Sequence, residues 1–161
     1  MEVKVGYDGI VMANAAGEAR LALTRRQIWL ALAERVPAPD GGERLVENPY
    51  ERWSEIDPSL PDRRIEVLGP PPTSGTRDAF VELAMEGGCS TFAWIEHLEK
   101  TNPDDFKSIC HTVREDGLFI EAGENDNLIV QKLNANPAAL GIFGFSFLDQ
   151  IAEKVQGATV D

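Results

Sequence analysis

The sequence predicts an α/β fold, a three-layer sandwich in which helices cover both faces of a mainly parallel sheet of about five strands. Short apolar segments bounded by glycine or proline alternate along the chain with segments whose apolar residues recur every three or four positions. The first pattern is typical of buried strands and the second of amphipathic helices. The chain has 161 residues, of which 43% are hydrophobic and 26% charged. This is enough to bury one core, so we expect residues 1–161 to form a single domain.

The N-terminal part is predicted to hold a strand followed by a helix. Residues 4–13 are apolar and interrupted by glycine, as in a buried strand that bends. Thr24 can cap a helix while Gln27 reaches back to it, which is the capping-box arrangement. The apolar face of this helix comprises Ile28, Leu32 and Val36. Pro37 is expected to end the helix.

The middle of the chain is predicted to form an ordered loop and then a strand, a tight loop and a helix. Residues 37–63 are rich in Pro, Gly, Asp and Arg, with aromatic residues spaced through them, which favours a pinned loop over a linker. A short strand follows at residues 64–69. After residues 70–77, an apolar helical pattern begins at Phe80.

The C-terminal part is predicted to alternate helices and strands. Apolar residues at i, i+3, i+4 and i+7 indicate a helix over residues 105–114. An extended segment at 118–120 precedes a helix that starts near 123–127. Residues 141–145 are predicted as a buried strand, and residues 148–155 as the last helix.

The loop Thr73-Ser74-Gly75-Thr76-Arg77 has the composition of an anion site. Because it follows a strand and opens a helix, its backbone N–H groups lack helical partners and the helix dipole favours a negative charge. Ser74 and Thr76 add hydroxyl donors, and Gly75 lets the backbone approach a ligand closely. Arg77 in the first turn opposes the dipole, unless its guanidinium clamps a tetrahedral oxyanion. The alternative is that Ser74 only caps the helix and Arg77 is solvated.

At this loop the chain resembles the periplasmic phosphate-binding proteins of bacterial phosphate-specific ABC transporters, whose second lobe carries a Ser-Gly-Thr anion loop at a helix start. Other segments resemble that lobe in the same order along nearly the whole chain. They are residues 5–11, 23–28, 53–61, 123–127 and 139–145. The resemblance implies the lobe fold of the type II periplasmic-binding proteins.

The resemblance also implies a function, which is non-catalytic binding of inorganic phosphate or a similar tetrahedral oxyanion, without a cofactor. Ser74, Gly75 and Thr76 match the phosphate contacts of the family. Many members carry an arginine a few residues before the serine, where this chain has the prolines 70–72. Arg77 is therefore the candidate for the missing guanidinium.

Members of this family have two lobes that grip phosphate in the periplasm and hand it to an inner-membrane permease. This chain resembles the second lobe alone, so we expect an isolated lobe, natural or engineered, that lacks the first lobe and a signal peptide. With one side of the site open to water, binding should be weaker. The apolar face that would meet the first lobe favours a homodimer. A self-associating domain without ligand binding is the alternative function.

Charge and hydropathy exclude several other partners. The formal net charge is −12, which argues against a broad basic face for nucleic acid or anionic lipid. No apolar run approaches the roughly 20 residues that span a bilayer.

Two small groups of residues admit more than one interpretation. Cys89 and Cys110 form either one disulfide or two buried thiols. A zinc site with His97 and His111 is disfavoured, because the spacings fit no common structural site, and we expect no metal.

The remaining candidates are acidic residues and a nucleophile. Glu121, Glu124 and Asp126 form an acidic cluster that we interpret as helix capping, with Asp126 as the candidate that orients Arg77. A serine hydrolase would need Ser74 in a Gly-x-Ser-x-Gly elbow, which is absent, so we expect no enzyme.

Overall fold

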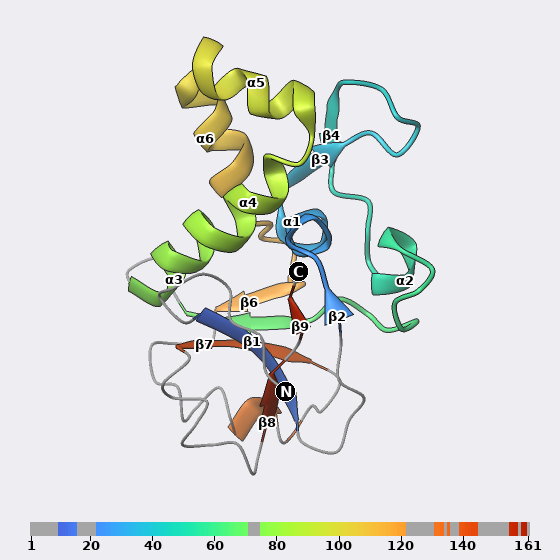
Figure 1. Cartoon of the computed structure of the whole chain (residues 1–161). Coiled ribbons are helices and arrows are strands. Elements are labelled where there is room, and N and C mark those ends of the chain that lie inside the picture. Colours follow the sequence, from blue (N-terminus) through green and yellow to red (C-terminus); the bar gives the residue numbers. More distant parts are fainter. Residues whose placement is uncertain are drawn as a thin grey trace.

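A five-stranded sheet with the order β6-β5-β7-β1-β8 lies at the base of the molecule in Figure 1. The computed structural model describes residues 10–15, 22–70, 75–121, 131–133, 135, 139–144, 155–157 and 159–160. The strands of this sheet are β1 (Ile10–Ala15), β5 (Val67–Gly69), β6 (Phe119–Glu121), β7 (Leu140–Gly144) and β8 (Val155–Gly157).

The sheet is mainly parallel, as predicted. β5 pairs in parallel with β6 on one side and with β7 on the other. β1 is antiparallel to both β7 and β8, so it alone runs against the other four strands of this sheet. All three residues of β5 are buried, as expected for a central parallel strand.

Two further sheets in the described part of the chain have two strands each. β2 (Ala22–Leu23) pairs in parallel with β9 (Thr159–Val160). β3 (Arg35–Pro37) and β4 (Leu45–Glu47) form an antiparallel hairpin, in which Val36 lies opposite Val46.

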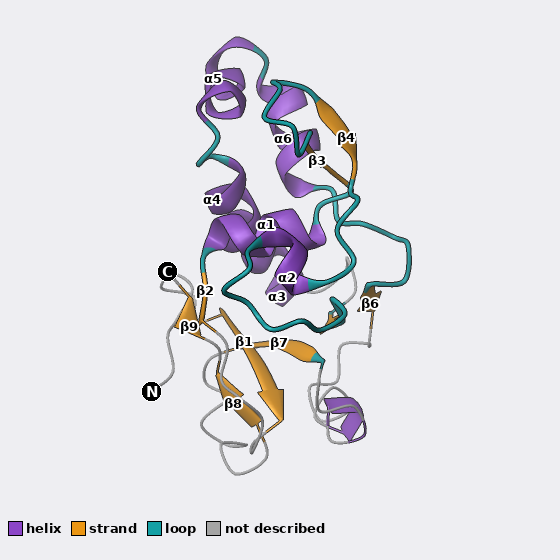
Figure 2. Ribbon diagram, turned by 90° about the vertical axis from the view of Figure 1, so that its right-hand side faces the viewer, coloured by secondary structure: helices purple, strands orange, loops and turns teal. Residues whose placement is uncertain are grey.

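The labelled helices lie on one side of the main sheet, and the helical residues 131–133 lie on the other (Figures 1 and 2). The α/β class is thus confirmed. Those on the first side are α1 (Arg25–Leu32), α2 (Trp53–Ile56), α3 (Gly75–Phe80), η1 (Val81–Met85), α4 (Glu86–Cys89), α5 (Ala93–Thr101) and α6 (Pro103–His111). α3, the π-helical η1 and α4 follow one another without a break and, with α5 and α6, connect β5 to β6. A connection of this length is what two parallel neighbouring strands require. None of the described helices has the length and apolar character needed to cross a bilayer.

The predicted capping box at the start of α1 is confirmed, but the predicted end of this helix is wrong. The Gln27 amide donates to Thr24 Oγ1 at 3.0 Å, and the Thr24 amide donates to Gln27 Oε1 at 2.9 Å. α1 ends at Leu32, and Val36 lies in β3. The reason is pairing with distant segments, because the Glu34 amide donates to the Thr112 carbonyl and Val36 packs into the core from a strand.

The predicted C-terminal helix is also wrong at its end, and its first part lies outside the described residues. Val155 is a strand residue of β8, opposite Ala15 of β1. The helix that was predicted to start near residues 123–127 also falls mostly outside the described residues. Of this segment, the structure describes residues 131–133, which are helical.

The core lies between the helices and the sheet. The largest side chains with no more than 1% exposure are Trp29, Trp53, Phe80, Ile28, Leu32, Ile65, Met85 and Ile95. The burial of Trp53 confirms that the segment 37–63 is pinned by an aromatic residue, although this segment also contains β4 and α2.

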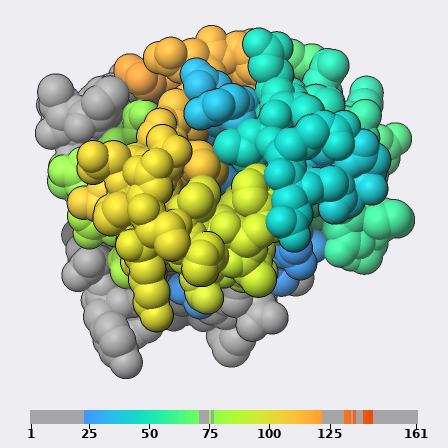
Figure 3. Space-filling view, turned by 90° about the horizontal axis from the view of Figure 1, so that it is seen from above, coloured from blue at the N-terminus to red at the C-terminus, as the bar shows by residue number. Residues whose placement is uncertain are grey.

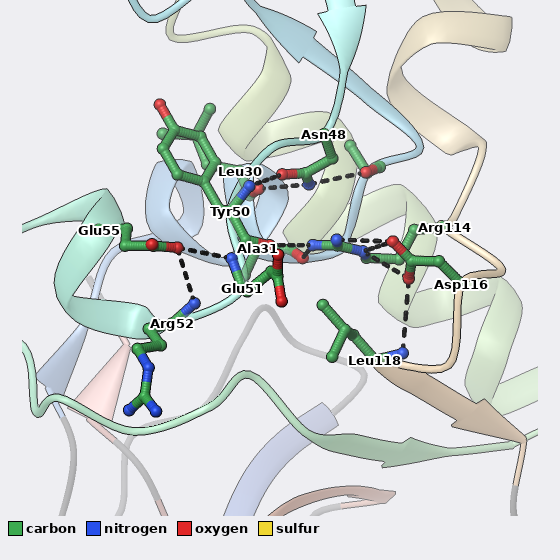
Figure 4. Close-up of polar contacts among 11 residues, drawn as sticks. Leu30, Ala31, Asn48, Tyr50, Glu51, Arg52, Glu55, Arg114, Asp116 and Leu118 are labelled. Atoms are coloured by element: carbon green, nitrogen blue, oxygen red, sulfur yellow. Dashed lines mark hydrogen bonds and ion pairs between the residues drawn. The ribbon is translucent and has the colours of Figure 1, made fainter.

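A buried arginine ties this core to the segment that precedes β6 (Figure 4). The Arg114 side chain is 3% exposed, and its Nη1 donates to the carbonyl oxygens of Ala31 at 2.8 Å and Tyr50 at 2.9 Å. Its Nη2 and Nε donate to the carboxylate of Asp116. The Leu118 amide donates to the same carboxylate at 3.5 Å. The chain therefore enters β6 from a fixed position.

Candidate anion-binding site

The candidate site lies at the carboxyl edge of the parallel strands. Gly75, the first residue of α3, comes five residues after Pro70, which directly follows β5. In the neighbouring strand, Glu121 ends β6 and is paired with Gly69. Ligands of α/β proteins bind at this edge, because strand ends and helix starts meet there.

The structure describes the predicted anion loop in part. Ser74 and Asp126 lie outside the described residues, and the side chain of Thr76 does too, although its backbone belongs to α3. Gly75 is exposed, and a Cβ built on it would meet nothing within 4 Å. The approach to the helix start is therefore open at this residue.

Arg77 lies against the ends of the strands. Its Nη1 donates to the Pro70 carbonyl at 3.2 Å and lies 3.9 Å from Glu121 Oε2. Its guanidinium carbon is 5.1 Å from the ring centre of Phe119, a cation–π distance. The guanidinium is thus held by one carbonyl, one carboxylate and one ring at the edge where the anion loop begins.

Burial sets the electrostatics of Arg77. Its side chain is 14% exposed, and the loss of hydration lowers the pKa of the guanidinium below its ordinary, very high value. The carboxylates of Glu121, Asp78 and Glu115 act in the opposite direction and favour the charged form. A guanidinium with so high an ordinary pKa stays protonated, so Arg77 places a poorly hydrated positive charge at this edge.

Phe119 and Gly69 shape the surface under Arg77. A Cβ on Gly69 would lie 2.6 Å from Phe119 Cζ, so the glycine makes room for this ring on β5. The ring in turn packs under the guanidinium. The absence of a side chain at residue 69 therefore helps to position Arg77.

Two small cavities flank Arg77. One, of about 330 Å³, is also lined by Glu115, Phe119 and Glu121. The other, of about 270 Å³, is also lined by Asp78, Glu82 and His111. Carboxylates lie beside Arg77 in both linings and repel anions, so an anion is expected to bind toward the start of α3, where helix amides add to the positive charge.

The two cysteines resolve into a disulfide behind the site. Cys89 at the end of α4 is bonded to Cys110 in α6, with 5.5 Å between their Cα atoms. Beside it, His111 Nε2 lies 2.9 Å from Glu86 Oε1. Both contacts attach the helical run that begins at Gly75 to α6. In the described part of the chain, no group of three or more His, Cys, Asp or Glu side chains is arranged to hold a metal ion.

The structure describes one residue of the acidic cluster Glu121, Glu124 and Asp126. Glu121 ends β6 and lies beside Arg77, so the helix-capping interpretation is wrong for this residue, while the prediction for Asp126 lies outside the described residues. The sequence held a signal for the contact between Glu121 and Arg77. Residues 118–120 were predicted to be extended, and a strand that pairs in parallel with β5 ends beside the end of β5. Phe119 was missed because the stacking depends on the pairing of β5 with β6.

A helix start and a half-buried arginine at the carboxyl edge of a mainly parallel sheet are typical of α/β ligand-binding proteins. A family model described as a PBP superfamily domain matches residues 1–161, so the chain belongs to this superfamily.

Two relatives show what the chain is similar to in sequence. The phosphate-binding protein PstS of Staphylococcus saprophyticus is 22% identical over 160 residues, which cover 99% of this chain and 37% of that protein. Protein SphX of Synechocystis is 24% identical over 166 residues, which cover 100% of this chain and 38% of that protein. The chain thus spans well under half the length of these relatives.

A solved structure supports the fold. PstS from Borrelia burgdorferi matches with a TM-score of 0.60 at 15% identity, over 100% of this chain and 50% of that one. At this identity the match establishes the periplasmic-binding-protein fold alone.

Proposed function

We propose that this chain binds inorganic phosphate, or a similar tetrahedral oxyanion, without catalysing a reaction. The contacts are the backbone N–H groups of Ser74, Gly75 and Thr76 and the hydroxyls of Ser74 and Thr76, with Arg77 supplying positive charge. The observation that carries the proposal is the open helix start at Gly75 together with the poorly hydrated guanidinium of Arg77, two residues further along the same helix. Membership of the PBP superfamily and the name of the Staphylococcus relative support it.

The contacts of Arg77 define its role in this proposal. Glu121 is 48% exposed and 3.9 Å from Nη1, so this ion pair is loose and partly screened by water. The Pro70 carbonyl occupies one of the five N–H donors of the guanidinium. A phosphate at the helix start would compete with Glu121 for Arg77, while Pro70 and Phe119 keep the guanidinium in place.

The biological setting that we propose is phosphate uptake through an ABC transporter. The chain would serve as one lobe of a periplasmic substrate-binding protein that delivers phosphate to an inner-membrane permease. Residues 1–161 span 37% of the Staphylococcus relative, and a site covered from one side leaves its ligand in contact with water. We therefore expect these residues alone to bind phosphate more weakly than micromolar.

Isothermal titration calorimetry with phosphate tests the proposal. Replacing Arg77 with alanine should weaken binding about tenfold or more, the effect of losing one charge-assisted contact. Arg44→Ala is the matched control, because Arg44 is an exposed arginine that pairs with Asp40 at 2.7 Å on another loop. The control should bind like the unchanged chain. The proposal is wrong if millimolar phosphate gives no saturable heat, or if both variants bind with equal affinity.

A further inference from the structure

A larger pocket, of about 540 Å³, lies beside α1. It is lined by residues of α1, the loop between β3 and β4, α2 and the start of α5. Figure 3 shows the β3–β4 segment (cyan) against α5 (yellow-green) at the top of the molecule. The pocket shares no lining residue with the two cavities beside Arg77. Its size is within the range of small-molecule sites.

The walls of this pocket are fixed by hydrogen bonds. Gln27 Nε2 donates to Asp57 Oδ2 at 2.9 Å and so joins α1 to the loop after α2. In the β3–β4 loop, the Gly42 amide donates to Asp40 Oδ1 at 2.9 Å, and Arg44 Nη2 donates to Asp40 Oδ2 at 2.7 Å. A pocket between walls that are tied in this way is formed before any ligand arrives.

Arg26 is the cationic side chain of the lining. Its guanidinium carbon lies 3.9 Å from the ring centre of Phe92, so one face of the guanidinium is stacked on this ring. Within the described part of the chain, no ion pair involves Arg26. Stacking uses the face of the guanidinium and leaves its edge, where the N–H donors lie, to bind a planar anion.

The rest of the lining combines apolar surface with polar groups that already have partners. Leu30, Tyr50, Ile56 and Trp94 are partly buried and offer apolar surface to a ligand. The Asp57 carboxylate already accepts from Gln27 and from the Ser59 amide. The other acidic lining residue is Glu43, which is exposed and therefore well hydrated.

We propose that this pocket binds a small carboxylate that carries a planar apolar body. The carboxylate would take two hydrogen bonds from the edge of the Arg26 guanidinium, and the planar body would pack on the aromatic side chains of Tyr50 and Trp94. This site is independent of the proposed phosphate site, because it uses none of the residues around Arg77.

Titration of residues 1–161 with 1-naphthoate, followed by NMR, tests this inference. A ligand of this size in a fitting site should bind with a dissociation constant of about 1 mM or tighter. Arg26→Gln should weaken binding about tenfold, and so should replacing the carboxylate with a neutral alcohol, as in 1-naphthalenemethanol. Trp94→Leu should also weaken it. Glu43→Gln should strengthen it slightly, because a like charge is removed.

Two controls separate this pocket from the phosphate site and from loss of folding. Arg35→Gln removes another exposed arginine, which lies in β3 and outside this pocket, and should bind 1-naphthoate like the unchanged chain. Arg77→Ala should also leave the 1-naphthoate affinity unchanged, and an excess of phosphate should not displace the ligand. The inference is overturned if 1-naphthoate shows no saturable binding up to 10 mM, a concentration about ten times the expected constant. It is equally overturned if Arg26→Gln binds as well as Arg35→Gln while both variants melt at the same temperature.

Discussion

Replacing Arg114 with alanine is expected to destabilise the fold by about 3–5 kcal/mol, the usual effect of removing one partner from a buried ionic contact. The structure explains this magnitude. The side chain is 3% exposed and satisfies the carbonyl oxygens of Ala31 and Tyr50, and a buried acceptor left without a donor costs about 1–3 kcal/mol. Asp116 adds less, because its side chain is 52% exposed and can be hydrated when Arg114 is absent.

Urea unfolding followed by circular dichroism measures this loss. The matched control is Arg52→Ala, which breaks an ion pair with Asp62 at 3.3 Å between side chains that are 52% and 76% exposed. Such a surface pair contributes about 0–1 kcal/mol. If Arg114→Ala costs no more free energy of unfolding than Arg52→Ala, the role assigned to Arg114 is wrong.

Three further predictions concern the disulfide, an acidic residue and two glycines. Replacing both Cys89 and Cys110 with alanine should lower the free energy of unfolding by about 3 kcal/mol, as expected for a link across 21 residues, and reductant should have no effect on that variant in urea. The hydrogen bonds from Arg114 lower the pKa of Asp116 below its ordinary value of 3.8, so its contribution to stability is complete well above pH 3.8 and is lost as the pH falls through the lowered value. Asp116→Asn should therefore lose less stability than the unchanged chain between pH 6 and low pH in urea titrations; an equal loss would contradict the assignment. Gly88→Ala should destabilise by about 1–3 kcal/mol, because its Cβ would collide with the Arg25 carbonyl, whereas Gly75→Ala should fold normally since nothing lies within 4 Å of the added atom; equal melting temperatures would refute this contrast.

Local signals in the sequence were sufficient for many elements. The capping box of Thr24 and Gln27 and the buried strand at the end of residues 64–69 depend on neighbours within a few positions, and both are confirmed. The helix predicted over residues 105–114 corresponds to α6 (Pro103–His111), which starts two residues earlier behind its Asn102 cap. Its predicted end is wrong, because the helix stops at His111 and Val113 forms a bridge with Ala33 instead. These features could be read because their physical causes are local.

Features that depend on distant segments could not be read in the same way. Val36 continues a helical spacing, but the pairing of β3 with β4 makes it a strand residue. The sequence left disulfide and thiols open for Cys89 and Cys110, because only the packing of α4 against α6 brings the two sulfurs together. For the same reason Glu121, which the sequence analysis assigned to helix capping, was not recognised as the neighbour of Arg77.

The candidate site was predicted in kind and is described in part. The strand before the loop and the helix after it are as predicted, and Gly75 and Arg77 lie at the carboxyl edge of the sheet. The roles of Ser74, Gly75, Thr76 and Arg77 in anion binding stay predictions. The contact of Arg77 with Pro70 and Phe119 could not be foreseen, because it requires the pairing of β5 with β6.

The most direct test of the central claim is an NMR titration of ¹⁵N-labelled protein with phosphate, in which the backbone amides of Gly75 and Thr76 are observed. If these amides bind the anion, their signals should shift saturably and more than those of amides elsewhere, and Arg77→Ala should raise the phosphate concentration needed for half of the shift. Saturable shifts that occur elsewhere and leave these two amides unmoved would contradict the claim that the start of α3 is the anion site.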